Sequence, residues 1–163
     1  MKISKKIVLL GHFGVGKSSL IRRFVENTFS ENYRVTIGVH IFKKEVHIPS
    51  GEDVSLVIWD LEGNDDINQT RPSYLIGTSG FIYVFDLSRP VTYSTLNPDL
   101  NYIKSNFPKT PLKVVGNKAD LVTKDFIKQN NDIFKPFVDY YTSAKTGSKV
   151  EDLFTRLATE LIE

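Results

Sequence analysis

The sequence predicts an α/β fold in which a mostly parallel sheet is covered by helices on both faces. Short apolar, β-branched runs return at even intervals along the chain, and segments with helical periodicity separate most of them. The first run also leads through a glycine-rich turn directly into a helical pattern. Parallel strands buried on both faces read as continuous apolar runs joined by right-handed crossovers. We therefore expect a three-layer sandwich.

Six strands are predicted, each bounded by Gly, Pro, Asp or Asn. They are residues 7–10, 39–48, 54–59, 81–85, 112–115 and 138–141. Only the sequence PSGED separates the second strand from the third. This connection is too short for a crossover, so these two strands should pair antiparallel at the edge of the sheet.

Three helices have clear sequence signals. One apolar stripe at helical spacing comprises Val150, Leu153, Phe154, Leu157, Ala158, Leu161 and Ile162. The same spacing occurs after the glycine-rich turn, at Leu20, Ile21, Phe24 and Val25. Asn97 and Pro98 predict the cap and first turn of a helix that carries Leu100, Ile103 and Phe107. Stripes of this kind pack on a sheet.

Composition limits the possible functions. With 163 residues, 40% of them hydrophobic, the chain has the size of a single domain spanning residues 1–163. Its 21 basic and 19 acidic residues nearly cancel, so we expect no nucleic-acid partner. No cysteine is present, which excludes disulfides, and no apolar stretch is long enough for a transmembrane segment. We expect a cytoplasmic protein.

The glycine-rich turn carries a phosphate-binding motif. Residues 11–18 read GHFGVGKS, which matches G-x-x-x-x-G-K-[ST] between a strand and a helix. Glycines let successive backbone N–H groups face the phosphates, Lys17 would bridge the terminal phosphates, and Ser18 would bind Mg²⁺. The residues expected to contact phosphate are Phe13, Gly14, Val15, Gly16, Lys17, Ser18 and Ser19. The alternative is a glycine-rich turn with no ligand.

Asp60 ends the apolar strand 54–59 and is a candidate magnesium residue. A carboxylate at this position would act through a water molecule in the second coordination shell. It could equally be an aspartate that stabilises a turn after the strand.

A second motif predicts the base. Residues 117–120 read NKAD directly after a strand, and Ser143, Ala144 and Lys145 follow another strand. The Asp120 carboxylate can accept two N–H bonds from the edge of guanine. Adenine lacks that pair of donors and would leave a buried charge unpaired.

With these motifs in order, the chain resembles a Ras-superfamily GTPase, closest to the Rab branch, over essentially its whole length. That resemblance implies a P-loop NTPase fold, the G domain, with six strands and one of them antiparallel. It implies that Thr36 is the switch I threonine and a Mg²⁺ ligand, and that Asp60 and Gly63 form the switch II D-x-x-G motif. Thr36 and Gly63 should also contact phosphate. Asn117, Lys118 and Asp120 would then bind guanine.

The same resemblance implies roles for five further residues. Phe29 should pack against the guanine, and Tyr33 should cover the phosphates. The Ala144 backbone N–H should contact the guanine carbonyl, while Ser143 and Lys145 shape that loop.

Three residues bear on hydrolysis, and two of them depart from the family pattern. Phe13 stands where the family has a small residue, so its ring should lie near the terminal phosphate unless it folds onto apolar surface. Asn64 replaces a glutamine and is one methylene shorter, about 1.5 Å of lost reach. Arg34 could act as an arginine finger in cis, or could be an exposed switch residue. We therefore expect slow intrinsic hydrolysis, with Asn64 and Arg34 as the candidate catalytic residues.

The chain ends at Glu163 without the cysteine tail by which Rab and Ras proteins attach to membranes. We expect no lipid anchor here; a prokaryotic relative would lack one, and removal of a tail would give the same ending.

The function expected is therefore a GTP/GDP switch that binds effector and regulatory proteins through its switch regions. The alternative is a guanine-nucleotide-binding interaction module that does not hydrolyse GTP, which Phe13 and Asn64 favour. A P-loop kinase or ATPase would share Lys17 and Ser18 but has no need of the NKAD motif.

Overall fold

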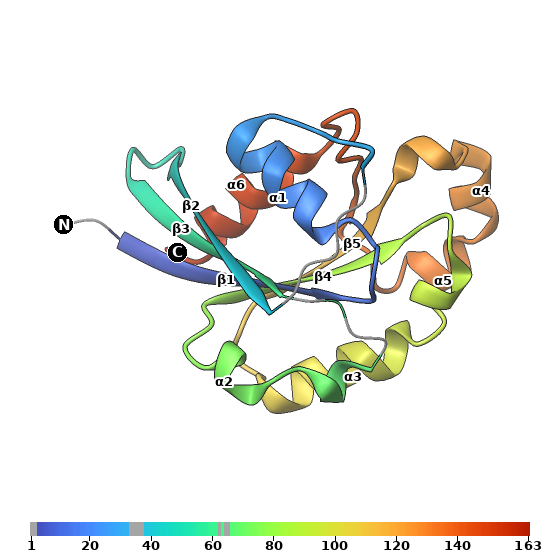
Figure 1. Cartoon of the computed structure of the whole chain (residues 1–163), viewed down its shortest axis with the longest axis horizontal. Coiled ribbons are helices and arrows are strands. Elements are labelled where there is room, and N and C mark those ends of the chain that lie inside the picture. Colours follow the sequence, from blue (N-terminus) through green and yellow to red (C-terminus); the bar gives the residue numbers. More distant parts are fainter. Residues whose placement is uncertain (1–2, 33–37, 62, 64–65) are drawn as a thin grey trace.

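A six-stranded sheet forms the centre of the described part of the chain (Figure 1). The computed structural model describes residues 3–32, 38–61, 63 and 66–163. The strands are β1 (Ile3–Gly11), β2 (Val39–His47), β3 (Asp53–Leu61), β4 (Gly80–Asp86), β5 (Leu112–Asn117) and β6 (Tyr140–Tyr141). Their order is β2-β3-β1-β4-β5-β6, and every neighbouring pair is parallel except β2 with β3. The predicted sheet, with one antiparallel edge strand, is confirmed.

Helices cover both faces of this sheet, which confirms the three predicted layers (Figure 1). On one face lie α1 (Lys17–Glu26) and α6 (Val150–Glu160). The opposite face carries α2 (Pro72–Leu75) and α3 (Leu96–Asn106), with α4 (Lys124–Gln129) and α5 (Asn131–Phe134) near its β6 end. Short 3₁₀ turns are η1 (Ile67–Gln69), η2 (Pro90–Thr92) and η3 (Ala119–Leu121).

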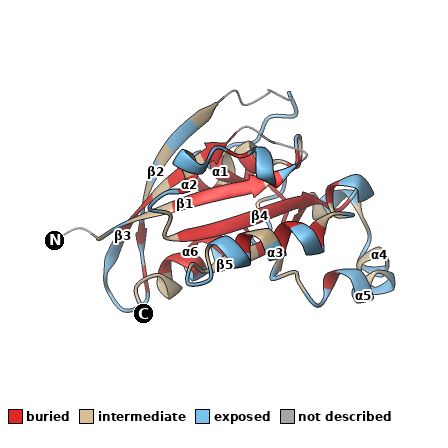
Figure 2. Ribbon diagram, turned by 90° about the horizontal axis from the view of Figure 1, so that it is seen from below, coloured by how far each residue is buried: buried red, intermediate tan, exposed pale blue. Residues whose placement is uncertain are grey.

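The core is divided by the sheet into two clusters. Successive side chains of β1 alternate between them, with Ile7 and Leu9 on the α1 and α6 side and Val8 and Leu10 on the other. Figure 2 shows β4 as buried, and β1 is buried over residues 7–10. This two-sided burial is the reason that the strands read as continuous apolar runs.

Two local predictions need correction. Helix α3 begins at Leu96 with Thr95 as its N-cap, so Asn97 is not the cap. Pro98 is accepted in the first turn because the N–H groups there have no partner within the helix. The last strand is only Tyr140–Tyr141, since the Val138 N–H instead donates to the Phe134 carbonyl and closes the turn after α5.

Parallel strands place their carboxyl ends at one edge of the sheet, where ligands bind in such folds. Here β1, β5 and β6 end at Gly11, Asn117 and Tyr141. Their following loops therefore meet at one site.

Candidate functional site

The backbone of the loop between β1 and α1 has the conformation that the phosphate-binding motif requires. Gly14 and Gly16 have φ of 74° and 98°, in the left-handed region that side chains rarely adopt. Gly16 is the N-cap of α1, so the loop ends at a helix N-terminus. A Cβ at Gly16 would lie 2.4 Å from the Asn117 amide nitrogen, which leaves room only for glycine.

Lys17 is the first residue of α1 and lies with its side chain turned back across this loop. Its ammonium donates to the Gly11 and His12 carbonyls, both at 3.2 Å. Burial lowers the pKa of Lys17 to about 8, an effect that the charge of Asp60 partly offsets. A phosphate beside this buried ammonium would supply the negative charge that favours its protonated form.

Ser18 and Asp60 come together from α1 and β3. The Ser18 hydroxyl donates to the Asp60 carboxylate, which is buried. Gly63, two residues after β3, lies against the phosphate loop so closely that a Cβ there would meet the Phe13 Cα at 2.6 Å. The D-x-x-G residues are therefore packed directly against the phosphate motif.

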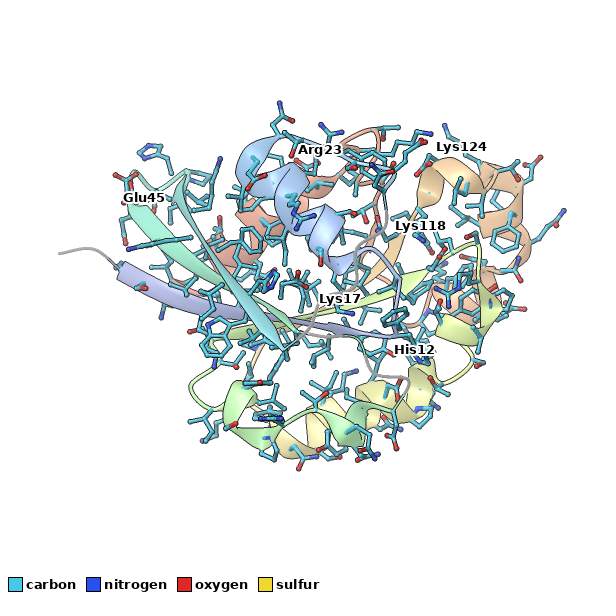
Figure 3. The ribbon with its side chains drawn as sticks, viewed as in Figure 1. His12, Lys17, Arg23, Glu45, Lys118 and Lys124 are labelled. Atoms are coloured by element: carbon cyan, nitrogen blue, oxygen red, sulfur yellow. The ribbon has the colours of Figure 1, made fainter. Side chains whose placement is uncertain are left out.

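The base motif is tied to the phosphate loop by two side chains. Asn117 is buried and donates to the Val15 carbonyl at 3.0 Å, while its own amide oxygen accepts from Thr142. Lys118 donates to the Gly14 carbonyl at 3.0 Å. Figure 3 shows Arg23 above Lys17 and Lys118. The two motifs thus form one rigid unit, although about a hundred residues separate them in sequence.

Asp120, in η3, is held by the loop after β6. The Ser143 hydroxyl donates to its Oδ1 at 2.7 Å, and Ser143 also accepts from the Thr146 N–H. A carboxylate has about four lone-pair sites, so Asp120 can accept two further N–H groups. The loop after β6 is held in turn by Arg23 of α1, which donates to the Ala144 and Lys145 carbonyls at 2.8 and 2.7 Å.

A cavity of about 300 Å³ joins these parts into one pocket. The predicted site residues that line it are Phe13, Gly14, Val15, Gly16, Lys17, Ser18, Ser19, Phe29, Asp60, Gly63, Asn117, Lys118, Asp120, Ala144 and Lys145. Ser143 lies behind Asp120 rather than on the pocket wall. Tyr33, Arg34, Thr36 and Asn64 lie outside the described residues.

Phe13 lines the pocket, and 40% of its surface is exposed. Arg89 donates to its carbonyl at 3.1 Å from the loop after β4. Phe13 is thus both a lining residue of the pocket and a backbone contact of the loop after β4.

Known proteins are similar to this chain over nearly its whole length. Residues 6–163 match the model of the Ras family. The chain belongs to the Ras family. It is 34% identical to the Ras-related protein Rab-1A of Dictyostelium discoideum, over 96% of this chain and 79% of that protein. It is 32% identical to the Ras-related protein Rab-32B of the same organism, over 97% of this chain and 64% of that protein. The resemblance to the Rab branch of small GTP-binding proteins is thereby confirmed.

The pocket of this Ras-family chain has oxygen groups that suit Mg²⁺. Ser18 and Asp60 bring a hydroxyl and a carboxylate together, and Mg²⁺ prefers such hard oxygen ligands. Within the part of the chain that the structure describes, no group of three or more His, Cys, Asp or Glu side chains could hold a metal.

Sequence reasoning missed several residues that shape the site of this Ras-family chain. Arg23 belongs to no sequence motif, yet it fastens the loop after β6. Asp86, fully buried at the end of β4, pairs with Lys118 at 2.9 Å. Glu31 pairs with Lys145 across the pocket at 3.0 Å. Arg23, Asp86 and Glu31 themselves lie outside the sequence motifs.

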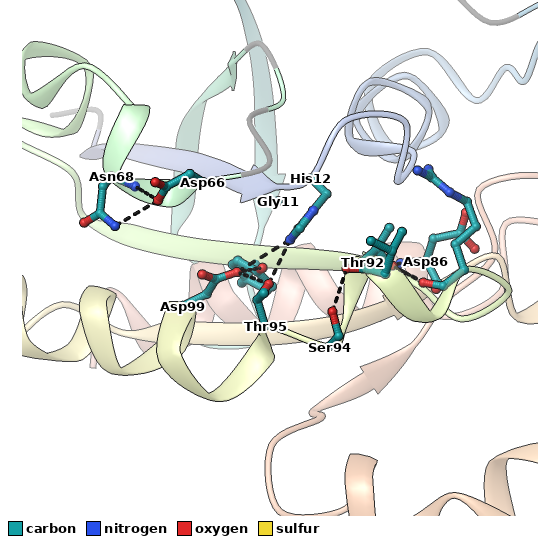
Figure 4. Close-up of polar contacts among 12 residues, drawn as sticks. Gly11, His12, Asp66, Asn68, Asp86, Thr92, Ser94, Thr95 and Asp99 are labelled. Carbon is teal, nitrogen blue, oxygen red and sulfur yellow. Dashed lines mark hydrogen bonds and ion pairs between the residues drawn. The ribbon is translucent and has the colours of Figure 1, made fainter.

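A buried polar network behind the phosphate loop was also missed (Figure 4). Tyr83 and Thr95 donate their hydroxyls to the Asp99 carboxylate at 2.5 and 3.0 Å. His12 Nε2 and the Thr95 hydroxyl are hydrogen-bonded as well, at 3.0 Å. Burial and the hydrogen bond to Asp99 raise the pKa of Tyr83, so its hydroxyl stays neutral. This network attaches the phosphate loop to α3.

None of the helices within the described ranges combines the length and the apolar character needed to cross a bilayer.

Proposed function

We propose that residues 1–163 act as a single G domain that binds GTP and GDP with Mg²⁺, hydrolyses GTP slowly and switches its interactions with protein partners. The observation that carries the proposal is that the phosphate loop and the NKAD motif line one pocket of about 300 Å³ and are bonded to each other. A nucleotide spans such a pocket, with its phosphates at one end and its base at the other.

The residues at the phosphate end of the pocket would bind the phosphates and Mg²⁺. Lys17 and the N–H groups of residues 13–19 bind the phosphates, where the α1 N-terminus adds its positive partial charge. Ser18 and Thr36 hold Mg²⁺ directly and Asp60 holds it through water. When bound, the ion neutralises charge on the phosphate oxygens.

The base end reads guanine in this proposal. Asp120 accepts two N–H bonds from the base. Asn117 and Lys118 hold the base-binding motif against the phosphate loop. Phe29 packs on the ring, Tyr33 covers the phosphates, and the Ala144 N–H donates to the guanine carbonyl. Ser143 and Lys145 hold the shape of that loop.

Base selectivity tests the proposal. The wild-type protein should bind GDP roughly a hundredfold or more tightly than ADP, because adenine leaves the Asp120 charge without its two donors. Asp120→Asn should lose most of the GDP affinity while the protein stays folded, since the amide oxygen can still accept from Ser143. Equal or tighter binding of ADP would instead support a P-loop kinase or ATPase.

We also propose that this protein hydrolyses GTP slowly. Phe13 lines the pocket, and its backbone lies beside Gly63, so its ring would restrict water and exclude an arginine from a partner. Asn64 is too short to orient water as glutamine would, and Arg34 is the candidate group that could compensate in cis.

Single-turnover hydrolysis of GTP with Mg²⁺ separates these possibilities. Phe13→Gly or Asn64→Gln should accelerate a slow wild-type reaction. Brisk wild-type turnover would contradict the slow switch and point to Arg34. No turnover in any variant would favour the interaction module that does not hydrolyse GTP.

A further inference from the structure

Residues 28–32 form one wall of the nucleotide pocket and have few polar contacts with the rest of the molecule. All five of these residues line the cavity. Thr28 bonds to Glu26 and the Asn32 N–H bonds to Ser30, so both contacts are local. Among the described residues, the one polar contact that joins this segment to a distant element is the ion pair of Glu31 with Lys145.

Lys145, on the opposite wall, has a firmly held backbone. Arg23 of α1 donates to its carbonyl at 2.7 Å and to the preceding Ala144 carbonyl at 2.8 Å. The Thr146 N–H donates to Ser143, which closes the loop on itself. Lys145 is therefore a fixed point to which the segment of residues 28–32 can be fastened.

The ion pair joins two residues that both line the pocket. Its Nζ–Oε1 distance is 3.0 Å. The hydrogen bond and the charge of Glu31 raise the pKa of Lys145, with a smaller contribution from Asp120. Both side chains are more than half exposed, at 52% for Lys145 and 74% for Glu31, so dissolved salt screens their attraction.

We propose that Glu31 is a positioning residue for the nucleotide. The ion pair of Glu31 with Lys145 keeps residues 28–32 closed against the base and slows nucleotide release. This inference rests on the proposed function. Glu31 acts through Phe29, the residue proposed to cover the guanine, rather than on the phosphates. GDP and GTP should therefore be retained by it to the same extent, and the rate of hydrolysis should not depend on it.

The test is the rate at which a fluorescent GDP analogue leaves the Mg²⁺ complex when excess GDP is added. Glu31→Gln should release it about two- to fivefold faster than the wild type, the range expected for an exposed ion pair. Glu52→Gln removes the same charge from the hairpin between β2 and β3, outside the pocket, and should release at the wild-type rate.

Salt and charge reversal separate an ion pair from a merely structural role. Raising the ionic strength should accelerate release from the wild type and leave Glu31→Gln nearly unchanged. Glu31→Lys should release faster still, and adding Lys145→Glu should recover part of the loss. Because Glu31 is exposed, each variant should keep the wild-type melting temperature.

Equal release from the wild type and Glu31→Gln would overturn the inference, and so would an equal effect of Glu52→Gln. These outcomes leave the proposed function intact, because the wild type still binds guanine nucleotide. A wild type that binds no guanine nucleotide would overturn both.

Discussion

Gly16 and Gly51 provide a matched test of the phosphate loop at the scale of single residues. Their φ values are 98° and 94°, so alanine should cost each about 1–2 kcal/mol of folding free energy through the backbone alone. A Cβ at Gly16 also meets Asn117 at 2.4 Å, whereas nothing lies within 4 Å at Gly51. Gly16→Ala should therefore lose GDP affinity and Gly51→Ala should not, as measured by calorimetry beside urea unfolding. Equal GDP affinity in the two variants would contradict the close packing of the two motifs.

The residues that could be predicted from sequence at this scale are those that act within a motif. Lys17, Ser18 and Asp120 were found because the order of their neighbours is itself the signal. Arg23 and Glu31 were missed because their partners, Ala144 and Lys145, lie far away in the chain. A charged side chain on a helix or loop reads as ordinary solvated surface until the fold places its partner beside it.

At the scale of elements, an ion pair joins β5 to α6 and should make the stability of the protein depend on pH. Glu160 of α6 bonds to Lys113 of β5 at 3.0 Å and to Arg156 at 3.3 Å. Burial alone would raise the pKa of Glu160, but these two cations outweigh it and lower the pKa. The stability that this carboxylate contributes is therefore present above its ordinary pKa of 4.5 and is lost as the pH falls through its lowered value in the folded protein.

Glu160→Gln should accordingly destabilise the protein at pH 7 by about 0.5–1 kcal/mol, the usual value for a partly exposed pair. The difference between variant and wild type in urea unfolding should shrink as the pH is lowered below 4.5. A difference that stays constant with pH would show that the charge of Glu160 is not what stabilises this contact.

The six strands and the three longest helices, α1, α3 and α6, were predictable because periodicity reports burial directly. The ends of these elements were not predictable. The start of α3 was misplaced because Asn97 and Pro98 both suit a helix start, and Pro is accepted anywhere in the first turn. The last strand was drawn too long because Val138 is apolar and β-branched, although its N–H closes a turn. Such ends are decided by individual hydrogen bonds that apolar patterns do not encode.

The whole molecule should be stabilised by its ligand, because the pocket unites loops that follow β1, β3, β5 and β6. A ligand that binds only the folded state at a thousandfold excess over its Kd adds about 4 kcal/mol. For a chain of this size, GDP with Mg²⁺ should therefore raise the melting temperature by roughly 10 °C. ADP should raise it little, and a chelator of Mg²⁺ should remove part of the gain from GDP. Equal shifts with ADP and GDP would contradict the proposed base selectivity.

This Ras-family protein should change conformation with the nucleotide it holds, and hydrogen exchange measures that change residue by residue. Amide exchange in residues 33–37 and 60–66 should differ between the complexes with GDP and with a GTP analogue that cannot be hydrolysed. Exchange in β1, β4 and α6 should be the same in both complexes, since these elements form the buried core. Identical exchange throughout the chain would contradict a switch and leave a protein that binds guanine nucleotide without responding to it.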